Sequence, residues 1–392
     1  MIRPVLLALV VLLLSACSSA APKEVTFHAT DNPEKLSEWG LFTVADGKIT
    51  PHEGMVTYEL NSPLFSDYAQ KWRTIWMPAN VAAQYEPQQA FDFPVGTIIT
   101  KTFYYTVPAS DRPGESDTVL KMTPAMYQSG TDGLDIGHVR MIETRLLVRR
   151  ADGWAALPYV WNSDQTEATL QRAGADVPLT IKSYSDSKRF TYSVPNANQC
   201  AGCHASNYED RAIHPIGLKA RHLNRDFEGP GGEINQLRRL VKLGYLKGVP
   251  GMENVPHNAK WDDSSLPIGD RARSYLDINC SHCHSETGPA RVSGLWLASE
   301  VTDLRKWGVC KPSVAAGRGT GGRDFDILPG EPHQSILTYR LESTDPGEMM
   351  PEVGRSLEHK EGVDLVTRWI SQLTDSCDVA RAARSGREPA TG

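Results

Sequence analysis

Residues 271–284 of this chain read RARSYLDINCSHCH, and the stretch carries two signals at once. Apolar side chains recur at helical spacing from Ala272 to Ile278, which predicts an amphipathic helix with Asp270 as its N-cap. The helix runs directly into two cysteines that are separated by two residues and followed by a histidine. The fold therefore has to place two thiols and an imidazole together at the end of a helix.

The same Cys-x-x-Cys-His pattern occurs a second time, at residues 200–204, which read CAGCH. Two thiols at this spacing can reach the two vinyl groups on one edge of a porphyrin, and the histidine that follows lies beneath the iron as its proximal ligand. Two copies of the pattern predict two covalently attached haem c groups. The predicted thioether residues are Cys200, Cys203, Cys280 and Cys283, and the predicted iron ligands are His204 and His284.

Two other uses of paired cysteines are alternatives. A zinc site with four thiolate ligands would join the two pairs, but compact zinc ribbons separate their pairs by only about 15–20 residues, far fewer than this chain does. A thioredoxin-like redox pair needs a βαβ pattern around it, and the flanking sequence shows none. The spacing therefore favours haem.

The N-terminus has the layout of a bacterial lipoprotein signal peptide. An apolar run at residues 5–14 is too short to span a bilayer, and LSAC at residues 14–17 matches a lipobox. We therefore expect residues 1–16 to be removed and Cys17 to be lipidated, with an ordinary secretory signal as the alternative. Ser18 resembles an outer-membrane sorting signal, so we expect the protein to be anchored to a bacterial membrane, the outer one, and to face the periplasm.

Two further cysteines, Cys310 and Cys377, lie outside these motifs. Spare cysteines in an oxidising compartment usually pair, so we predict a disulfide between them, with free thiols as the alternative. This bond would tie the segment after the second motif to the end of the chain.

The composition is that of an ordinary globular protein. Of the 392 residues, 40% are hydrophobic and 22% are charged, which excludes disorder along the whole chain. Lys and Arg number 41 against 47 Asp and Glu, a formal net charge of −6, and no basic stripe is present, so nucleic-acid binding is not expected. The sequence shows no dinucleotide fingerprint, and we identify no catalytic residue in it.

Strand-forming patterns dominate the first half of the chain, for example at residues 97–107 and 179–184, and helical spacing follows at residues 233–246. We therefore predict an α+β multidomain fold, in which an N-terminal mostly-β, sandwich-like domain precedes mainly α-helical cytochrome c modules. The predicted parts are a signal peptide at 1–16, an anchor and linker at 17–60, the mostly-β domain at 61–195, a first haem module at 196–260, a class I-like cytochrome c domain at 261–377 and a disordered tail at 378–392.

A haem that only transfers electrons usually keeps two axial ligands, so each iron needs a second one. For the second haem we predict Met350, which lies just before Pro351, with the adjacent Met349 as the alternative. For the first haem Met252 is one candidate. The alternatives left open there are an unliganded distal site, His214, His222 and His257.

Two arginines, Arg318 and Arg323, lie in a glycine-rich loop at residues 317–323. Arginine forks match carboxylates, so these two side chains are candidates to pair with haem propionates. A solvated loop without any ligand is the alternative.

Several stretches give the chain a resemblance to a known family. They are LFSDYA at 64–69, IETRLL at 142–147, QCAGCH at 199–204, RARSYLDINCSHCH at 271–284 and LPGEP at 328–332. Through them the chain resembles an uncharacterised family of bacterial dihaem c-type cytochrome lipoproteins, whose haem ligands match His204 and His284, while Met350 fits by position. Members are often encoded beside a parallel-β-helix lipoprotein, so the resemblance implies such a partner. It implies no substrate.

The motifs and the resemblance together imply a periplasm-facing dihaem c-type cytochrome that transfers electrons between redox partner proteins. One alternative is a dihaem peroxidase-like enzyme with an open first haem and an acid or base beside it. Another is the cytochrome subunit of a periplasmic dehydrogenase whose catalytic cofactor is bound by another chain.

Overall fold

The computed structural model describes residues 24–123, 133–229, 232–314 and 316–378. The predicted signal peptide, Cys17 and nearly all of the predicted tail lie outside these residues. The strands are β1 (Phe42–Ala45), β2 (Lys48–Pro51), β3 (Val56–Thr57), β4 (Gln70–Trp76), β5 (Ala83–Gln84), β6 (Ile98–Thr106), β7 (Thr118–Leu120), β8 (Leu134–Asp135), β9 (Val139–Arg150), β10 (Gly153–Trp161), β11 (Ala168–Leu170), β12 (Ala175–Lys182), β13 (Ser187–Val194), β14 (Asp226–Gly229), β15 (Gly232–Asn235) and β16 (Leu246–Lys247).

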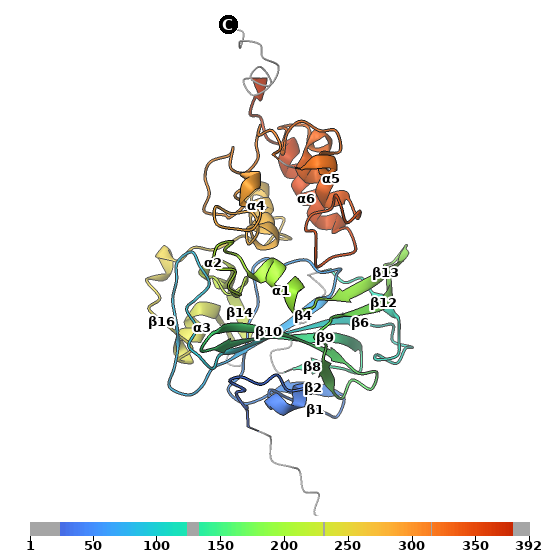
Figure 1. The fold of residues 1–392 in the computed structure, drawn as a ribbon, viewed down its shortest axis with the longest axis vertical. Helices are drawn as coiled ribbons and strands as arrows, with labels where there is room; N and C mark the ends of the chain where they lie inside the picture. The colour runs from blue at the N-terminus through green and yellow to red at the C-terminus, as the bar shows by residue number, and fades with distance from the viewer. Residues whose placement is uncertain (1–23, 124–132, 230–231, 315, 379–392) are drawn as a thin grey trace, which may run out of the picture.

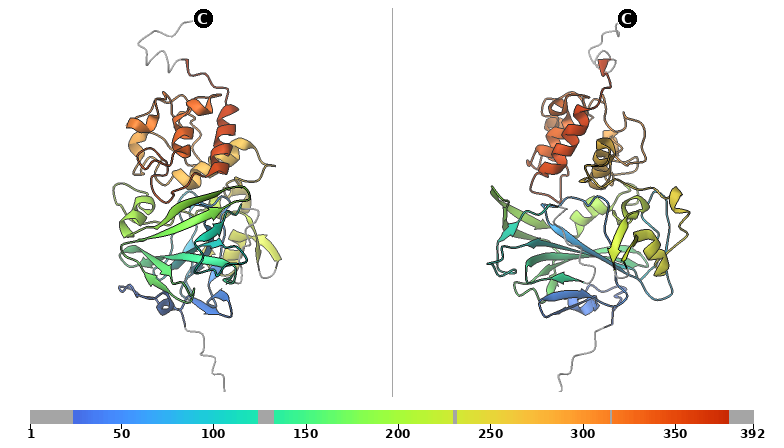
Figure 2. Two further views of the ribbon diagram at one scale, coloured as in Figure 1. Left: turned by 90° about the vertical axis from the view of Figure 1, so that its right-hand side faces the viewer. Right: turned by 180° about the vertical axis from the view of Figure 1, so that it is seen from behind.

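A six-stranded antiparallel sheet forms the centre of the molecule, with the strand order β11-β10-β9-β6-β4-β3 (Figure 1). Successive side chains of a strand point to opposite sides, so the sheet presents two faces. One face packs Ile98, Leu146 and Val148 against Ile49 and Leu134 of a small sheet, β1-β2-β8. This small sheet lies below the large one in both views of Figure 2, and β1, β2 and β3 fall within the stretch predicted to be anchor and linker.

The opposite face of the large sheet has two neighbours. At one end Phe103 and Ile142 pack against Leu179 and Tyr192 of a three-stranded sheet, β13-β12-β7. At the other end a second apolar cluster joins residues of the sheet, such as Ile75, to the segment that follows the first motif. That segment therefore extends the core of the sheets.

Six α-helices lie among the described residues, and only α4 and α6 are longer than eight residues. They are α1 (Ala197–His204), α2 (Ala220–Leu223), α3 (Gln236–Lys242), α4 (Ile268–Cys280), α5 (Ile336–Glu342) and α6 (Lys360–Ser371). The prediction that a β part is followed by mainly α-helical cytochrome c modules is therefore wrong, because sheets dominate the structure.

Glycines and short strands account for this error. A longer helix was predicted at residues 233–246, but this stretch begins in β15, which pairs with β14, and ends in β16, which pairs with β5. Between α4 and α5 the described residues form turns, isolated bridges and 3-10 segments. Gly294 and Gly308 adopt positive φ in that region, which a regular α-helix does not accommodate.

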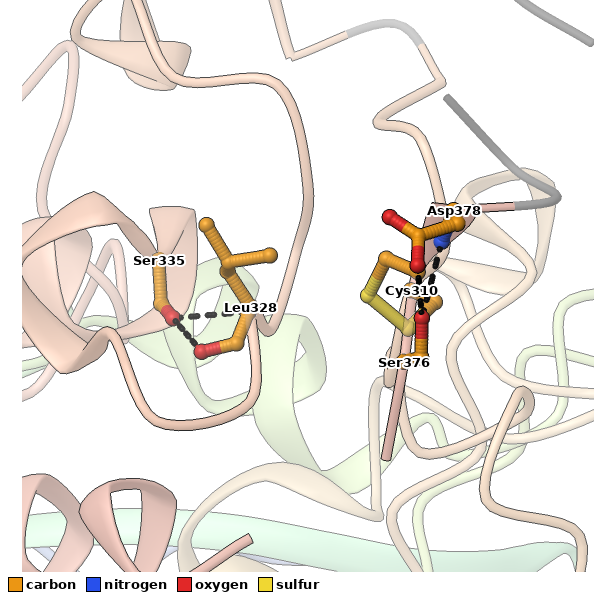
Figure 3. The surroundings of a disulfide bond; sticks show 6 residues. Cys310, Leu328, Ser335, Ser376 and Asp378 are labelled. Carbon is orange, nitrogen blue, oxygen red and sulfur yellow. Dashed lines mark hydrogen bonds between the residues drawn. A yellow bond between two sulfur atoms is a disulfide. The ribbon is translucent and has the colours of Figure 1, made fainter. Parts of the chain in front are cut away.

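A separate apolar cluster holds the C-terminal part together. α4 and α6 pack against each other through residues that include Tyr275 and Trp369, and the Trp369 ring meets the Trp307 ring edge to face at 6.3 Å. Cys310 and Cys377 form a disulfide, as predicted, and it fastens the segment after α6 to the loop between α4 and α5 (Figure 3). No helix within the described ranges combines the length and the apolar character that crossing a bilayer requires.

Candidate functional site

Both cysteine motifs stand at the C-terminal ends of helices. α1 begins with a capping box, in which the Asn196 side chain accepts a hydrogen bond from the Gln199 N–H and the Gln199 side chain accepts one from the Asn196 N–H, each at 2.9 Å. The first motif occupies the last five residues of α1. α4 ends at Cys280, and the rest of the second motif continues as a turn in which the His284 N–H donates to the Cys280 carbonyl oxygen at 2.8 Å.

The fold brings the two motifs into contact, although they are far apart in the sequence. The Cys283 thiol donates to the Gly202 carbonyl oxygen, with 3.7 Å between sulfur and oxygen. The segments after the motifs also meet, because the Tyr208 N–H donates to the Thr287 carbonyl oxygen at 2.8 Å and the Arg291 guanidinium lies 3.6 Å above the centre of the Tyr208 ring. Groups attached at the two motifs would therefore be neighbours.

All four motif cysteines are free thiols, whereas Cys310 and Cys377 are paired. Burial is the main cause that raises the pKa of Cys283 to about 12, and the nearby Cys203 thiol raises it as well. The second thiols of the two motifs therefore lie close to each other without bonding. Within the part of the chain that the structure describes, no three His, Cys, Asp or Glu side chains are grouped as a metal ion would require.

The two motif histidines have the environment of iron ligands. The His204 Nδ1–H donates to the His214 carbonyl oxygen at 2.7 Å. The His284 Nδ1–H donates to the Ser293 hydroxyl oxygen at 3.2 Å, because that hydroxyl already donates to the Ala290 carbonyl oxygen. Metal-binding histidines use this arrangement, which leaves Nε2 unprotonated. Burial lowers the pKa of His204 to about 3 and that of His284 to about 4, so both rings are neutral, and the residues present fit two attached haems.

The loop that carries Met350 lies beside the second motif. The Met350 N–H donates to the Arg340 carbonyl oxygen at 2.9 Å. Burial is the main cause that lowers the pKa of His284, and the positive charge of Arg340 is the next largest. The negative charge of Glu352 raises the pKa of Cys283 in the same motif. Met350 is partly exposed, whereas the alternative Met349 is buried.

The two arginines that the sequence suggested as propionate partners are engaged with protein groups. Arg318 forms an ion pair with Asp345 at 2.8 Å, and Arg323 donates to a backbone carbonyl oxygen at 2.8 Å. The cations whose charges reach the histidine of the second motif are Arg340 and Lys311. Both are also engaged with protein groups, since Lys311 forms an ion pair with Asp326 at 3.0 Å and Arg340 Nε donates to the Glu348 carbonyl oxygen at 2.8 Å.

Met252, the candidate ligand of the first haem, belongs to a different part of the structure. It packs against the apolar cluster around α3 and β16 and lines a pocket formed by residues outside both motifs. Of the alternatives, His257 is exposed, and the buried His222 ring lies 3.4 Å from the Asn258 amide nitrogen. His214 provides the carbonyl oxygen that orients the first motif histidine.

His282 is not among the ligands predicted from the sequence, because it occupies a variable position of the second motif. It is 7% exposed, and its Nδ1 has no hydrogen-bond partner among the described residues. Burial is the main cause that lowers its pKa to about 4, the charge of His284 lowers that pKa as well, and His282 in turn lowers the pKa of His204. A buried neutral imidazole near the first motif is a candidate sixth ligand for that haem.

No protein-family model, curated protein or solved structure matches this chain. The resemblance to dihaem cytochrome lipoproteins therefore rests on the residues that carry it. The chemistry of the site is that of two free dithiol motifs in mutual contact, each followed by a neutral histidine.

Proposed function

We propose that this chain is a dihaem c-type cytochrome that faces the periplasm and transfers electrons between redox partner proteins. The observation that carries the proposal is the contact between the two motifs at Cys283 and Gly202. Porphyrins attached to motifs that touch would lie close enough for an electron to pass between them inside the protein. The free thiols and the neutral histidines support the same function.

The residues of the two motifs have separate tasks in this proposal. The two cysteines of each motif would hold one porphyrin through thioethers, and His204 or His284 would hold its iron. When bound, the haem iron supplies a one-electron couple between its ferrous and ferric states. Met350 would complete the coordination of the second iron and favour a higher reduction potential than a second histidine would. Cys280 lies within the apolar cluster of α4 and α6 and is buried there.

The location and the partners form a further part of the proposal. Lipid attached to Cys17 would anchor the protein to a bacterial membrane, with Ser18 favouring the outer membrane. Redox partners dock transiently through interfaces that bury less than about 1,200 Å², so the chain needs no large apolar patch for them. A parallel-β-helix lipoprotein is the partner that the family resemblance suggests.

Haem content in matched variants tests the proposal. The purified protein is expected to retain two haems per chain after acid–acetone extraction, measured by absorbance and by intact mass. Cys200→Ala with Cys203→Ala, and Cys280→Ala with Cys283→Ala, are each expected to leave one haem. Cys310→Ala with Cys377→Ala is the control and should keep both. Colour that acid–acetone removes, or two haems in a motif variant, would contradict the proposal.

Carbon monoxide distinguishes the electron carrier from the peroxidase-like alternative. If both irons keep two axial ligands from the protein, the spectrum of the reduced protein stays unchanged when the gas is added. A shifted spectrum would instead show an open distal site and favour the enzyme.

A further inference from the structure

The face of the large sheet nearest α1 carries three cations side by side. β4, β6 and β9 are neighbours, and their register places Arg73 opposite Lys101 and Lys101 opposite Arg145. Side chains directly opposite each other in a ladder stand on the same face of a sheet. We refer to Arg73, Lys101 and Arg145 as the cationic row.

The next row of the same face adds a fourth cation and one carboxylate. The register places Lys71 opposite Phe103 and Phe103 opposite Glu143. Glu143 is fully buried and accepts a hydrogen bond from Arg145 Nε at 2.8 Å. The charged groups of Lys71, Lys101 and Arg145 gather around the Phe103 ring, at 5.5, 5.1 and 4.3 Å from its centre.

Among the described residues, this face therefore holds more positive than negative charge in a partly buried place. Like charges directly opposite each other destabilise a sheet, and a buried charge without a counter-charge costs more still. Arg73 donates to the Lys71 carbonyl oxygen at 3.3 Å, and burial together with the two neighbouring guanidinium groups lowers the pKa of Lys101 to about 7. Asp67 also faces Lys71, but its carboxylate is engaged with backbone N–H groups just before α6.

α1, which ends in the first motif, lies beside this face of the large sheet. The charges of Lys101 and Arg145 act on Cys200, Cys203 and His204. α1 contacts β10, which is the strand beside β9, and Figure 1 shows α1 between the large sheet and the C-terminal helices. A large group attached to the first motif would therefore meet these cations.

We propose that the cationic row, together with Lys71, binds the carboxylates of the porphyrin attached to the first motif. A haem carries two propionate groups, which would offset most of the excess charge on this face. Guanidinium and ammonium groups bind carboxylates through charge-assisted hydrogen bonds. The inference rests on the proposed function and gives the large sheet a role in it, as the wall that receives the first haem.

Redox titration of a Lys101→Met variant of the full protein tests this assignment. A nearby positive charge favours the ferrous over the ferric iron, so the variant is expected to lower the potential of one haem and leave the other unchanged. Lys188→Met, which removes an exposed lysine of β13, is the matched control and should shift neither potential. Two unchanged potentials, or equal shifts of both, would overturn the assignment. A protein without covalent haem would instead refute the proposed function.

The sign of a stability change separates haem binding from a purely structural role of Lys101. With both haems present, Lys101→Met removes a cation that a propionate offsets, so the melting temperature should fall. In the Cys200→Ala, Cys203→Ala background the first porphyrin is absent, and the same substitution should relieve repulsion and raise the melting temperature. The same sign in both backgrounds would contradict the proposal.

Discussion

The disulfide between Cys310 and Cys377 closes a loop that contains α5, Met350 and α6. Replacing both cysteines by Ala frees this loop in the unfolded chain, which gains conformational entropy. For a separation of 67 residues, the loop-closure relation predicts a loss of about 4 kcal/mol in the free energy of unfolding at 25 °C. Because Met350 lies within the loop, we also expect, under the proposed function, that Met350 would dissociate from the second iron at a lower concentration of denaturant.

Urea unfolding followed by circular dichroism measures the loss, with the haem spectrum recorded alongside. Ser376→Ala is a suitable control, because it removes the hydroxyl that donates to Asp378 Oδ2 at 2.6 Å beside Cys377 and leaves the disulfide intact (Figure 3). This control should change the free energy of unfolding by less than about 0.5 kcal/mol. An unchanged unfolding midpoint in the double cysteine variant would refute the loop-closure argument.

Four other variants test the site and its surroundings. Met350→Ala is expected to abolish the charge-transfer band between methionine sulfur and ferric iron, and an unchanged band would assign the ligand elsewhere. His282→Leu should make the reduced protein bind carbon monoxide, whereas Met252→Leu should not; the opposite result would restore Met252 as the ligand. Burial raises the pKa of Glu361, but its ion pair with Lys121 at 2.7 Å and a tyrosine hydroxyl outweigh burial and hold that pKa below its ordinary value of 4.5. The stability that Glu361 provides is therefore present above pH 4.5 and lost as the pH falls through its folded-state pKa, and Glu361→Gln should flatten this part of the curve of melting temperature against pH.

Local sequence patterns predicted individual strands and helices better than the way in which these elements pack together. The β-branched and aromatic run at residues 97–107 corresponds to β6, and the run at 179–184 overlaps β12, because alternation along a strand is a local property. Helical spacing predicted a helix at residues 233–246, but only the two turns of α3 are helical. The residues at both ends of this stretch pair with other strands instead, as β15 and β16. The C-terminal part is less helical than predicted because turns, isolated bridges and glycines with positive φ occupy the stretch between α4 and α5.

Local sequence patterns likewise predicted the residues of the candidate site but not the contacts between them. The two cysteine motifs are visible in the sequence because their chemistry depends on residues that lie next to each other, and the disulfide was predicted because only two cysteines were left over. The contact between the motifs and the cationic row depend on packing and on strand register, which no local pattern encodes. Arg73, Lys101 and Arg145 lie far apart in the sequence and become neighbours only through the pairing of β4, β6 and β9.

Under the proposed function, the burial of the motif thiols determines whether haem is attached before or after the chain folds. Cys200 and Cys280 are 7% and 8% exposed, and burial raises the pKa of both thiols. A folded apoprotein would thus offer an incoming porphyrin neither access nor a reactive thiolate. Under the proposed function, the prosthetic groups must be loaded onto a chain that is still open after export. Completion of the tertiary structure then seals them in place.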